Sequence, residues 1–308
     1  MGVKLEHHIN ETQFAFDTQN SSETQNSSDV PKSSEAPKSS EFQFSSETAV
    51  SCIDLENVAV SFASKDVLES ISWSIKQGSI TTLIGPNGCG KSTLLKCIMG
   101  SCKMKTGQIF IKGKSLDQYA PNDLAKLIAF LPQAPEIPQD MVVEELVYCG
   151  RFPHQNWWRN SAREDRIAVE RALQATKTFH LKDQLINSLS GGERQRVWIA
   201  MALAQESEIL LLDEPTTYLD INHQLEVLDL LKRLNREQGL TVIMVLHELN
   251  QAAAYSHEVG VLHKGHLAAV GNPKRVFTPE LLEAVFAVKS HISCELGTPY
   301  IKIEGLLK

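Results

Sequence analysis

Apolar and polar residues alternate along three segments that follow the first fifty residues of the chain. The segments are residues 53–62 (IDLENVAVSF), 67–75 (VLESISWSI) and 108–113 (QIFIKG). Alternation places apolar side chains on one face of a strand and polar side chains on the other. The pattern therefore predicts half-buried strands, which we expect to pair in an antiparallel sheet at the start of a domain.

Four later segments are short and almost continuously apolar. They are residues 80–85 (ITTLIG), 127–133 (LIAFLPQ), 209–213 (ILLLD) and 241–247 (TVIMVLH). Strands that are apolar on both faces, with helical segments between them, are typical of a parallel sheet covered by helices. These segments predict an α/β fold.

Residues 141–189 have helical periodicity. The segments 141–151 (MVVEELVYCGR) and 162–179 (AREDRIAVERALQATKTF) each predict a helix. Together they indicate a mostly helical subdomain, at about residues 135–195, inserted between strands of the sheet.

Serine pairs begin at positions 21, 27, 33, 39 and 45, so this part of the chain is a hexapeptide repeat. A β-helix would need an aliphatic residue in register in each repeat, and none occurs. Serine-rich acidic repeats bury too little surface to offset the entropy of ordering. We therefore expect residues 1–50 to be disordered and without a readable role, residues 51–290 to form the domain, and residues 291–308 to form a C-terminal tail.

The composition is that of a soluble globular protein, with 308 residues of which 42% are hydrophobic and 22% are charged. No segment reaches the roughly 18 apolar residues of a membrane helix, and the amino terminus lacks the apolar core of a secretory signal. The six cysteines form no CxxC pair, which favours reduced thiols.

The net charge of −7 is unevenly distributed along the chain. Three Lys against six Glu and two Asp give residues 1–50 a charge of −5, which leaves −2 for the remainder. Because the domain has no strong basic field, we expect no nucleic-acid partner.

Residues 85–93 (GPNGCGKST) stand between a predicted strand and a predicted helix. The pattern GxxxxGK[ST] in this context is typical of a phosphate-binding loop, whose glycine amides and helix amino terminus surround phosphate oxygens. Lys91 would neutralise the β and γ oxygens of ATP, and the Ser92 hydroxyl would bind a magnesium ion, Mg²⁺. An ordinary glycine-rich turn is the alternative, and packing alone could explain Cys89. The expected nucleotide-binding residues are Gly85, Pro86, Asn87, Gly88, Cys89, Gly90, Lys91, Ser92 and Thr93.

The apolar segment 209–212 runs directly into two carboxylates, Asp213 and Glu214. An unpaired buried carboxylate costs several kcal/mol, so the pair implies a cation or a reactive group at the tip of the strand. We expect this strand to lie beside the strand that precedes the phosphate-binding loop, so that Asp213 reaches the same Mg²⁺. Glu214 could then accept a proton from a water that attacks the γ-phosphate. The alternative is a capped helix after a core strand.

A second candidate anion site lies in residues 189–204 (LSGGERQRVWIAMALA). Ser190 and Glu193 have the spacing of a capping box, which is the simple explanation. It leaves Gly191 and Gly192 unexplained, because glycine costs about 1 kcal/mol relative to alanine in a helix. Bare backbone at a helix amino terminus is a second place for a phosphate.

The order of GPNGCGKST, LPQ, LSGGERQ, LLLDEP, LD and His247 resembles the ATP-binding cassette of ABC transporters, across about residues 52–290. The resemblance implies a P-loop fold with a RecA-like core, an N-terminal antiparallel β subdomain and an inserted helical subdomain. It also implies a head-to-tail homodimer in which each ATP lies between one phosphate-binding loop and the partner's LSGG turn. The resemblance implies that Gln133 senses the γ-phosphate and Mg²⁺, that Glu214 is the general base and that His247 contacts the γ-phosphate. It also implies that Asp220 lies at the dimer seam and that Phe62 stacks on adenine. For Phe62, an ordinary role as a half-buried strand aromatic is the alternative.

One departure from the general cassette narrows the resemblance. EPTTYLDINHQ, together with GRFPH at residues 150–154, is similar to importers of ferric siderophores, ferric citrate, haem and cobalamin, and most similar to the siderophore and ferric-citrate group. This group implies integral membrane permease subunits, an extracytoplasmic solute-binding protein and a peripheral position on the cytoplasmic face of the membrane. In the family, the loop with Trp157 and Trp158 lies where the membrane subunit docks, although a core role for one tryptophan is equally consistent.

Three other classes share some of these motifs. Chromosome-maintenance and DNA-repair ATPases separate them with long heptad coiled coils, whereas Lys91 and Ser190 are 99 residues apart without heptads. Translation-associated proteins usually carry two cassettes in one chain. A regulator without turnover would be expected to lack Glu214 or His247. The sequence therefore favours an importer ATPase.

Overall fold

The fold is taken from a computed structural model, which describes residues 50–63, 65–133, 135, 140–155, 162–295 and 297–307. Residues 1–49, with the serine-pair repeat, and the tryptophans Trp157 and Trp158 lie outside the described residues.

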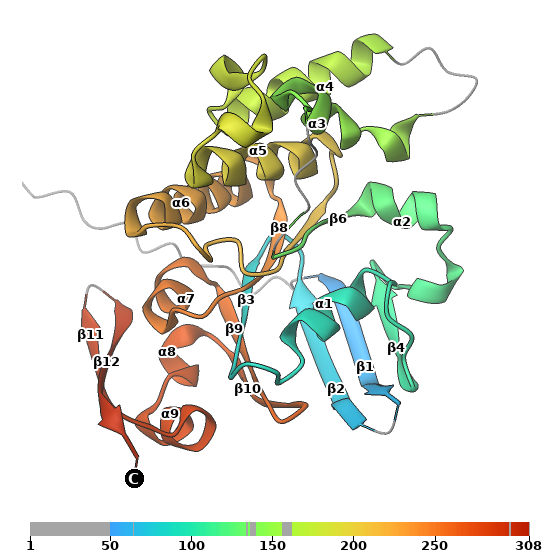
Figure 1. The fold of residues 1–308 in the computed structure, drawn as a ribbon. Helices are drawn as coiled ribbons and strands as arrows, with labels where there is room; N and C mark the ends of the chain where they lie inside the picture. Colours follow the sequence, from blue (N-terminus) through green and yellow to red (C-terminus); the bar gives the residue numbers. More distant parts are fainter. Residues whose placement is uncertain are drawn as a thin grey trace, which may run out of the picture. The chain divides into compact units, whose positions relative to one another are not determined.

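A six-stranded sheet forms the centre of the domain, with the strand order β10-β9-β3-β8-β7-β6 (Figure 1). The strands from β9 to β6 in this order are parallel to their neighbours, and β10 pairs antiparallel with β9. All four continuously apolar segments form strands of this sheet, as their composition predicts. The strands are β3 (Ile80–Ile84), β6 (Ile128–Leu131), β7 (Ile209–Leu212), β8 (Thr241–Val245), β9 (Glu258–His263) and β10 (His266–Gly271).

One detail of the predicted sheet is wrong. The strand that ends at Asp213 does not lie beside the strand that precedes the phosphate-binding loop, because β8 is hydrogen-bonded between β7 and β3. Leu211 of β7 pairs with Ile243 of β8, which in turn pairs with Thr81 of β3. All three strands are buried at every position, so their sequences contain no signal for their order.

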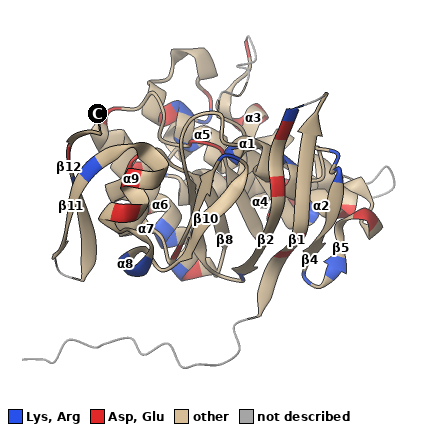
Figure 2. Ribbon diagram, turned by 90° about the horizontal axis from the view of Figure 1, so that it is seen from below, with Lys and Arg blue, Asp and Glu red and all other residues tan. Residues whose placement is uncertain are grey.

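A second sheet, with the order β2-β1-β4-β5, is antiparallel as the alternating segments predict. Its outer strand β2 carries charged residues of both signs, whereas β8 and β10 carry none (Figure 2). The strands are β1 (Ser51–Phe62), β2 (Lys65–Lys76), β4 (Thr106–Ile111) and β5 (Lys114–Ser115).

Helices cover the central sheet, and Figure 1 shows α3, α4 and α5 gathered at one end of the domain. These three span residues 143–204, so the helical region continues past the expected end near residue 195. Within the described residues, no helix is long and apolar enough to cross a bilayer. The α-helices are α1 (Lys91–Ile98), α2 (Pro121–Leu127), α3 (Val143–Cys149), α4 (Ala162–Ala175), α5 (Gly191–Ala204), α6 (Ile221–Gln238), α7 (Leu249–Tyr255), α8 (Pro273–Val276) and α9 (Pro279–Phe286). The short 3₁₀ helices are η1 (Leu116–Gln118), η2 (Phe152–His154), η3 (Phe179–Leu181) and η4 (Ile186–Ser188).

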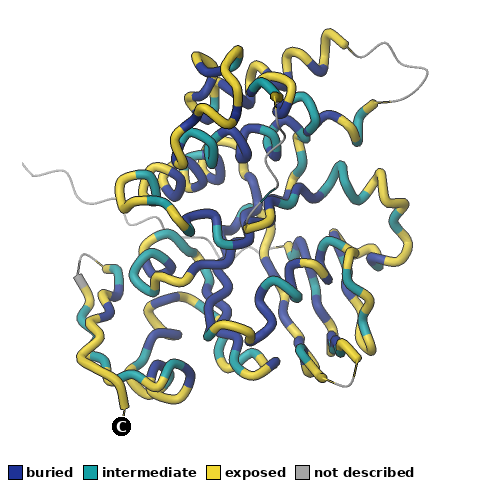
Figure 3. The backbone as a smooth tube through the Cα atoms, in the orientation of Figure 1, coloured by how far each residue is buried: buried dark blue, intermediate teal, exposed yellow. Residues whose placement is uncertain are grey.

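Two apolar cores lie on the two faces of the six-stranded sheet. Leu210 and Leu212 of β7 belong to one core, and Ile209 and Leu211 belong to the other. Successive side chains of a strand point to opposite faces, so a strand that is buried on both faces has to be continuously apolar. Figure 3 shows this as an unbroken buried stretch of the backbone through the centre of the domain.

The chain ends in a β-hairpin of β11 (Val288–Glu295) and β12 (Thr298–Leu306), where we expected a tail from residue 291. Asn250 of α7 joins this hairpin to the domain, because its side chain donates to the carbonyl of Ile301 (3.1 Å) and accepts from the Ile301 amide (2.8 Å).

Candidate active site

The phosphate-binding loop connects β3 to α1, as its sequence context predicts. Gly85 begins the loop with a φ of 151°, and a Cβ atom there would lie 2.0 Å from the carbonyl oxygen of Leu262 in β9. No side chain fits such a close approach, so this glycine lets the loop cross tightly over the neighbouring strand. The loop therefore lies at the carboxyl end of the parallel strands, where ligands of α/β folds usually bind.

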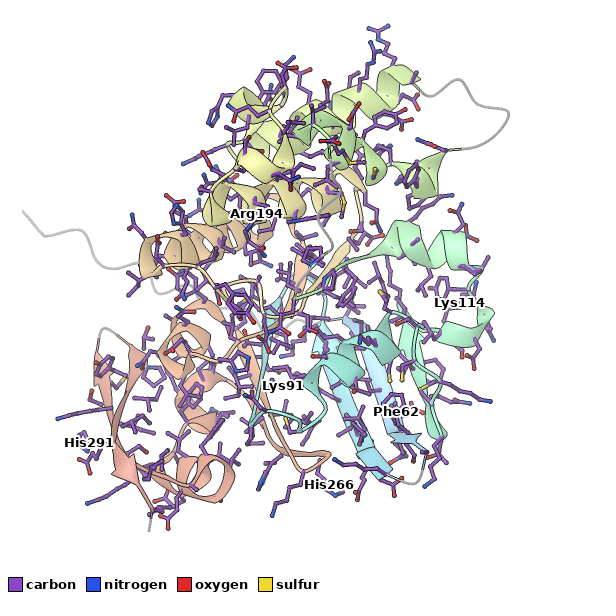
Figure 4. All side chains as sticks on the ribbon, in the orientation of Figure 1. Phe62, Lys91, Lys114, Arg194, His266 and His291 are labelled. Atoms are coloured by element: carbon purple, nitrogen blue, oxygen red, sulfur yellow. The ribbon has the colours of Figure 1, made fainter. Side chains whose placement is uncertain are left out.

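Lys91 is the first residue of α1, and Figure 4 shows it near the centre of the domain. It is only 6% exposed, and its Nζ donates to the carbonyl oxygens of Gly85 (2.8 Å) and Pro86 (3.1 Å). Among the described residues, the acceptors of this buried ammonium are neutral carbonyls, so it is ready to bind an anion, since a charged acceptor gives a stronger hydrogen bond. Lys91 is thus placed to bind phosphate at the amino end of α1.

Ser92 contacts Asp213 although β8 lies between β3 and β7. The contact is possible because Ser92 lies on α1, which follows β3, and not on the sheet itself. The Ser92 hydroxyl donates to Oδ1 of Asp213 at 3.1 Å. Burial raises the pKa of the Asp213 carboxyl, and the hydrogen bond from Ser92 opposes this effect. A nearby cation would stabilise the buried carboxylate.

These two side chains fit Mg²⁺. A hydroxyl and a carboxylate are oxygen ligands of the kind that this ion prefers, and Mg²⁺ usually takes its remaining ligands from water and substrate phosphates. Among the residues that the structure describes, no group of three or more His, Cys, Asp and Glu could hold a metal. Ser92 and Asp213 are therefore the described side chains whose chemistry fits a magnesium ion beside the loop.

Glu214 is the centre of a second set of contacts. His247 Nε2 lies 2.5 Å from Oε1, while the side chains of Gln133 and Thr217 donate to Oε2, the latter at 3.0 Å. The backbone of Glu214 has a φ of 53°, a strained value for a residue with a side chain. The turn directs the carboxylate away from Asp213 and toward His247.

A hollow of about 440 Å³ brings most of these groups together. Its lining residues are Val67, Asn87, Gly88, Gly90, Lys91, Ser92, Thr93, Gln133, Glu214 and His247. A larger hollow of about 940 Å³ lies beside α2 and β4 and includes Cys102 and Gln205, but none of the predicted phosphate-binding or catalytic residues. The chemistry therefore belongs to the smaller hollow.

Comparison with known proteins identifies the family of the chain. Residues 68–217 match the family model described as ABC transporter. An iron(3+)-hydroxamate import ATP-binding protein of Bacillus subtilis (strain 168) is 46% identical over 243 residues, which are 79% of this chain and 90% of that protein. The chain belongs to the ABC transporter family. It is an ATP-binding cassette with the RecA-like core, antiparallel β subdomain and helical subdomain that the resemblance implies, and cassettes of this family hydrolyse ATP.

Solved structures of the same family cover most of the chain. An inward-facing metal-chelate type ABC transporter is similar with a TM-score of 0.72 and 30% identity, over 84% of this chain and 98% of that one. A bacterial ABC transporter cassette solved as a dimer is similar with a TM-score of 0.63 and 28% identity, over 72% of this chain and 98% of that one.

The signature turn, which we define as Ser190, Gly191 and Gly192, does not line the cassette's phosphate hollow. It begins α5, and Figure 4 places Arg194 of the same helix well away from Lys91. The capping box is present, since Ser190 Oγ accepts from the Glu193 amide at 3.4 Å and the Ser190 amide donates to the Glu193 carboxylate at 3.0 Å. Within one chain, this turn and the phosphate-binding loop are separate sites.

Other predicted residues also lie outside the lining of the hollow: Gly85, Pro86 and Cys89 of the loop, Asp213, Phe62 and Asp220. Phe62 ends β1 with 55% of its surface exposed, and Figure 4 shows it apart from Lys91. Asp220 caps α6, and its Oδ1 accepts from the His223 amide at 3.0 Å.

Two residues of the site, Val67 and Thr217, were not predicted from the sequence. Val67 lines the hollow from β2, and Thr217 holds Glu214. The repeated threonine in EPTT is the only signal in the sequence that could have indicated the second contact.

Proposed function

We propose that this cassette is the ATP-hydrolysing subunit of an importer for iron(III) complexes such as siderophores or ferric citrate. The observation that carries the hydrolytic role is the convergence of Lys91, Ser92, Glu214 and His247 on one hollow. The ligand class is supported by the relative that imports iron(3+)-hydroxamate and by the similar metal-chelate type transporter. Haem or cobalamin uptake is the alternative ligand class, because those importers share the EPTTYLDINHQ and GRFPH patterns.

In this proposal the phosphate-binding loop holds the β- and γ-phosphates of ATP. The Lys91 ammonium exchanges its carbonyl partners for phosphate oxygens, and the loop amides complete the cradle. Ser92 and Asp213 would hold Mg²⁺, with Gln133 in reach of the same region through its contact with Glu214. The bound ion neutralises charge that develops on the phosphate oxygens.

Glu214 is the general base of the proposal. One of its carboxylate oxygens is held by His247 and the other by Gln133 and Thr217, so its direction is fixed before a water arrives. A positioned carboxylate can take the proton of a water that attacks the γ-phosphate. His247 would keep Glu214 and the γ-phosphate in register.

The active assembly would be a homodimer that works with integral membrane permease subunits and an extracytoplasmic solute-binding protein. The separation of the signature turn from the hollow supports a second chain, since one chain alone cannot place both on one phosphate. Asp220 would lie at the seam and Phe62 would stack on adenine. The cassette would then be peripheral on the cytoplasmic face of the membrane.

Mixing two inactive variants tests the two-chain site. Lys91→Ala should lose phosphate binding, and Ser190→Arg should block the seam with a bulky cation. In a heterodimer of the two, one composite site carries both changes and the other carries neither, so ATP hydrolysis should return in proportion to the mixed dimer. Crosslinking would quantify that dimer. Wild-type ATP hydrolysis by the Ser190→Arg homodimer would exclude the proposed role of the signature turn.

A cellular uptake assay tests the ligand class. Cells that carry only the Lys91→Ala chain should fail to accumulate one of four offered compounds: a ferric hydroxamate, ferric citrate, haem or cobalamin. Loss of haem or cobalamin uptake alone would replace the iron(III)-complex assignment with the alternative. Unchanged uptake of all four would exclude the importer role.

A further inference from the structure

His223 lies in the first turn of α6, within the sequence INHQ that sets this chain apart from the general cassette. Its Nδ1 lies 2.8 Å from Oδ1 of Asp220, the same oxygen that accepts from the His223 amide. An ionised carboxylate only accepts hydrogen bonds, so Nδ1 carries the proton. The ring therefore adds a second bond to an aspartate that the helix backbone already holds.

The other edge of the same ring lies against the signature turn. A Cβ atom on Gly192 would lie 2.1 Å from Cδ2, 2.5 Å from Cγ and 2.8 Å from Nε2 of His223. Cγ is at the base of the side chain, so the ring could not yield by a movement of its tip alone. The ring of His223 therefore explains why residue 192 has to be a glycine. The capping box alone does not explain it.

The neighbouring glycine differs. A Cβ atom on Gly191 would meet only Cδ2 of Leu219, at the ordinary contact distance of 3.6 Å. The requirement for glycine is therefore local to the position that faces the imidazole. Gly191 serves as a matched control, because it is the adjacent residue in the same first turn of α5.

Gln224, the next residue after His223, connects the first turn of α6 to α7. Its side chain donates to the carbonyl of Leu219 at 3.0 Å and accepts from Gln251 of α7 at 2.7 Å. Helix α7 begins two residues after His247. The first turn of α6 thus contacts the signature turn, the Asp220 loop and the helix that follows His247.

We propose that His223 is a positioning residue that fixes the distance between the signature turn and Asp220 within one chain. The inference rests on the proposed function, in which both elements face the partner's ATP. His223 fills the space that a side chain on Gly192 would need, and its Nδ1–H orients the Asp220 carboxylate. Without the ring, the signature turn and Asp220 are both present, but the distance between them is no longer fixed.

The first test is a cycle of thermal unfolding measurements on the isolated chain. Gly192→Ala should lower Tm by about 5 °C, because the added methyl group overpacks against the imidazole of His223. Adding His223→Ala should restore most of that loss, because all three clashing atoms are removed. Adding His223→Asn should not, since Asn keeps an atom at Cγ. Gly191→Ala should not lower Tm, because an added methyl group makes only an ordinary contact there and alanine favours the helix. A change in Tm from Gly192→Ala that is equal in the wild-type and His223→Ala backgrounds would overturn the packing relationship.

The second test separates positioning from general stability. His223→Ala should lower the kcat of ATP hydrolysis roughly tenfold, as expected for a displaced group near the reaction, with the KM for ATP within about twofold. His223→Asn should recover most of kcat, because its amide can donate from the Nδ1 position to Asp220. A kcat for His223→Ala equal to wild type would overturn the positioning role. Absence of hydrolysis by the wild-type chain would instead refute the proposed function, and the unfolding cycle would still decide whether His223 and Gly192 are coupled.

Discussion

Nε2 of His247 lies 2.5 Å from Oε1 of Glu214, and this contact joins the end of β8 to the strained turn after β7. Since Gln133 and Thr217 hold the other oxygen, both oxygens of Glu214 are in fixed positions. A fixed carboxylate is useful to a reaction that needs a base in one place. Glu214 is therefore the residue whose chemistry can be tested with the smallest change of shape.

Glu214→Gln should keep ATP binding and lower the rate of hydrolysis roughly 10²-fold or more, because general-base catalysis contributes about that much. The variant should also accumulate as an ATP-bound dimer. Single-turnover hydrolysis and size-exclusion chromatography with ATP measure the two effects. Glu237→Gln is the control, since Glu237 is exposed and forms only a surface contact with Arg236 at 3.5 Å among the described residues. Wild-type turnover in Glu214→Gln would refute the assignment of the base.

Asp213→Asn should separate stability from function. Because burial raises the pKa of Asp213, the folded chain holds this proton more tightly than the unfolded chain does. Stability therefore falls as the pH rises through the interval between the unfolded and folded pKa values, and the full penalty remains above it. At pH 7 without nucleotide, Asp213→Asn should melt a few degrees higher than wild type. The difference should shrink as the pH approaches about 4, the usual pKa of aspartate.

The same variant should respond less to magnesium and ATP. Wild type should gain Tm when both are added, because a ligand that binds only the folded state stabilises it. Asp213→Asn should gain less, since an amide replaces the charged ligand. An Asp213→Asn chain that melts below wild type at pH 7 would show that the carboxylate is better solvated than its burial indicates.

Much of the fold follows from the sequence because the strands of the central sheet are buried on both faces. In a strand such as β7, Leu210 faces one core and Leu211 the other, so every position is apolar and the strand can be recognised from its sequence. The order of the strands does not follow, since β3, β7 and β8 look alike. The C-terminal hairpin was also missed, because Asn250 secures it through contacts with a residue 51 positions later.

The candidate site divides in a similar way. The residues of the phosphate-binding loop are local in sequence, and six of the nine (Asn87, Gly88, Gly90, Lys91, Ser92 and Thr93) line one hollow. Thr217 was missed because its contact depends on the left-handed backbone of Glu214, which no pattern indicates. The constraint on Gly192 comes from His223, which lies on another helix. Contacts that depend on strain or on distant segments are the part that the sequence does not contain in readable form.

Cys89 should be a poor target for alkylation although it lies in the phosphate-binding loop. The residue is 7% exposed, and burial raises the pKa of its thiol. Since the thiolate is the reactive form, iodoacetamide at pH 7.5 should modify Cys89 at least about tenfold more slowly than the exposed Cys294. Mass spectrometry of timed samples measures both rates. Equal rates would mean that the loop opens often enough to expose Cys89.

Arg151 of the GRFPH segment forms a buried ion pair with Asp165 of α4, and this pair should stabilise the helical region. Nε of Arg151 donates to Oδ1 of Asp165 at 2.9 Å, with the two side chains 5% and 2% exposed. Asp165→Asn should lower the free energy of unfolding by about 3–5 kcal/mol, because it removes the buried carboxylate from a buried guanidinium and leaves the half-exposed Glu206 as its charged partner among the described residues. Arg151→Met with Asp165→Leu should cost less than Asp165→Asn, since no buried charge remains. In the exposed pair of Lys112 with Glu208, Glu208→Gln should change stability by less than about 1 kcal/mol. Urea unfolding measures all three, and a similar loss in Asp165→Asn and Glu208→Gln would show that the Arg151 charge stays solvated.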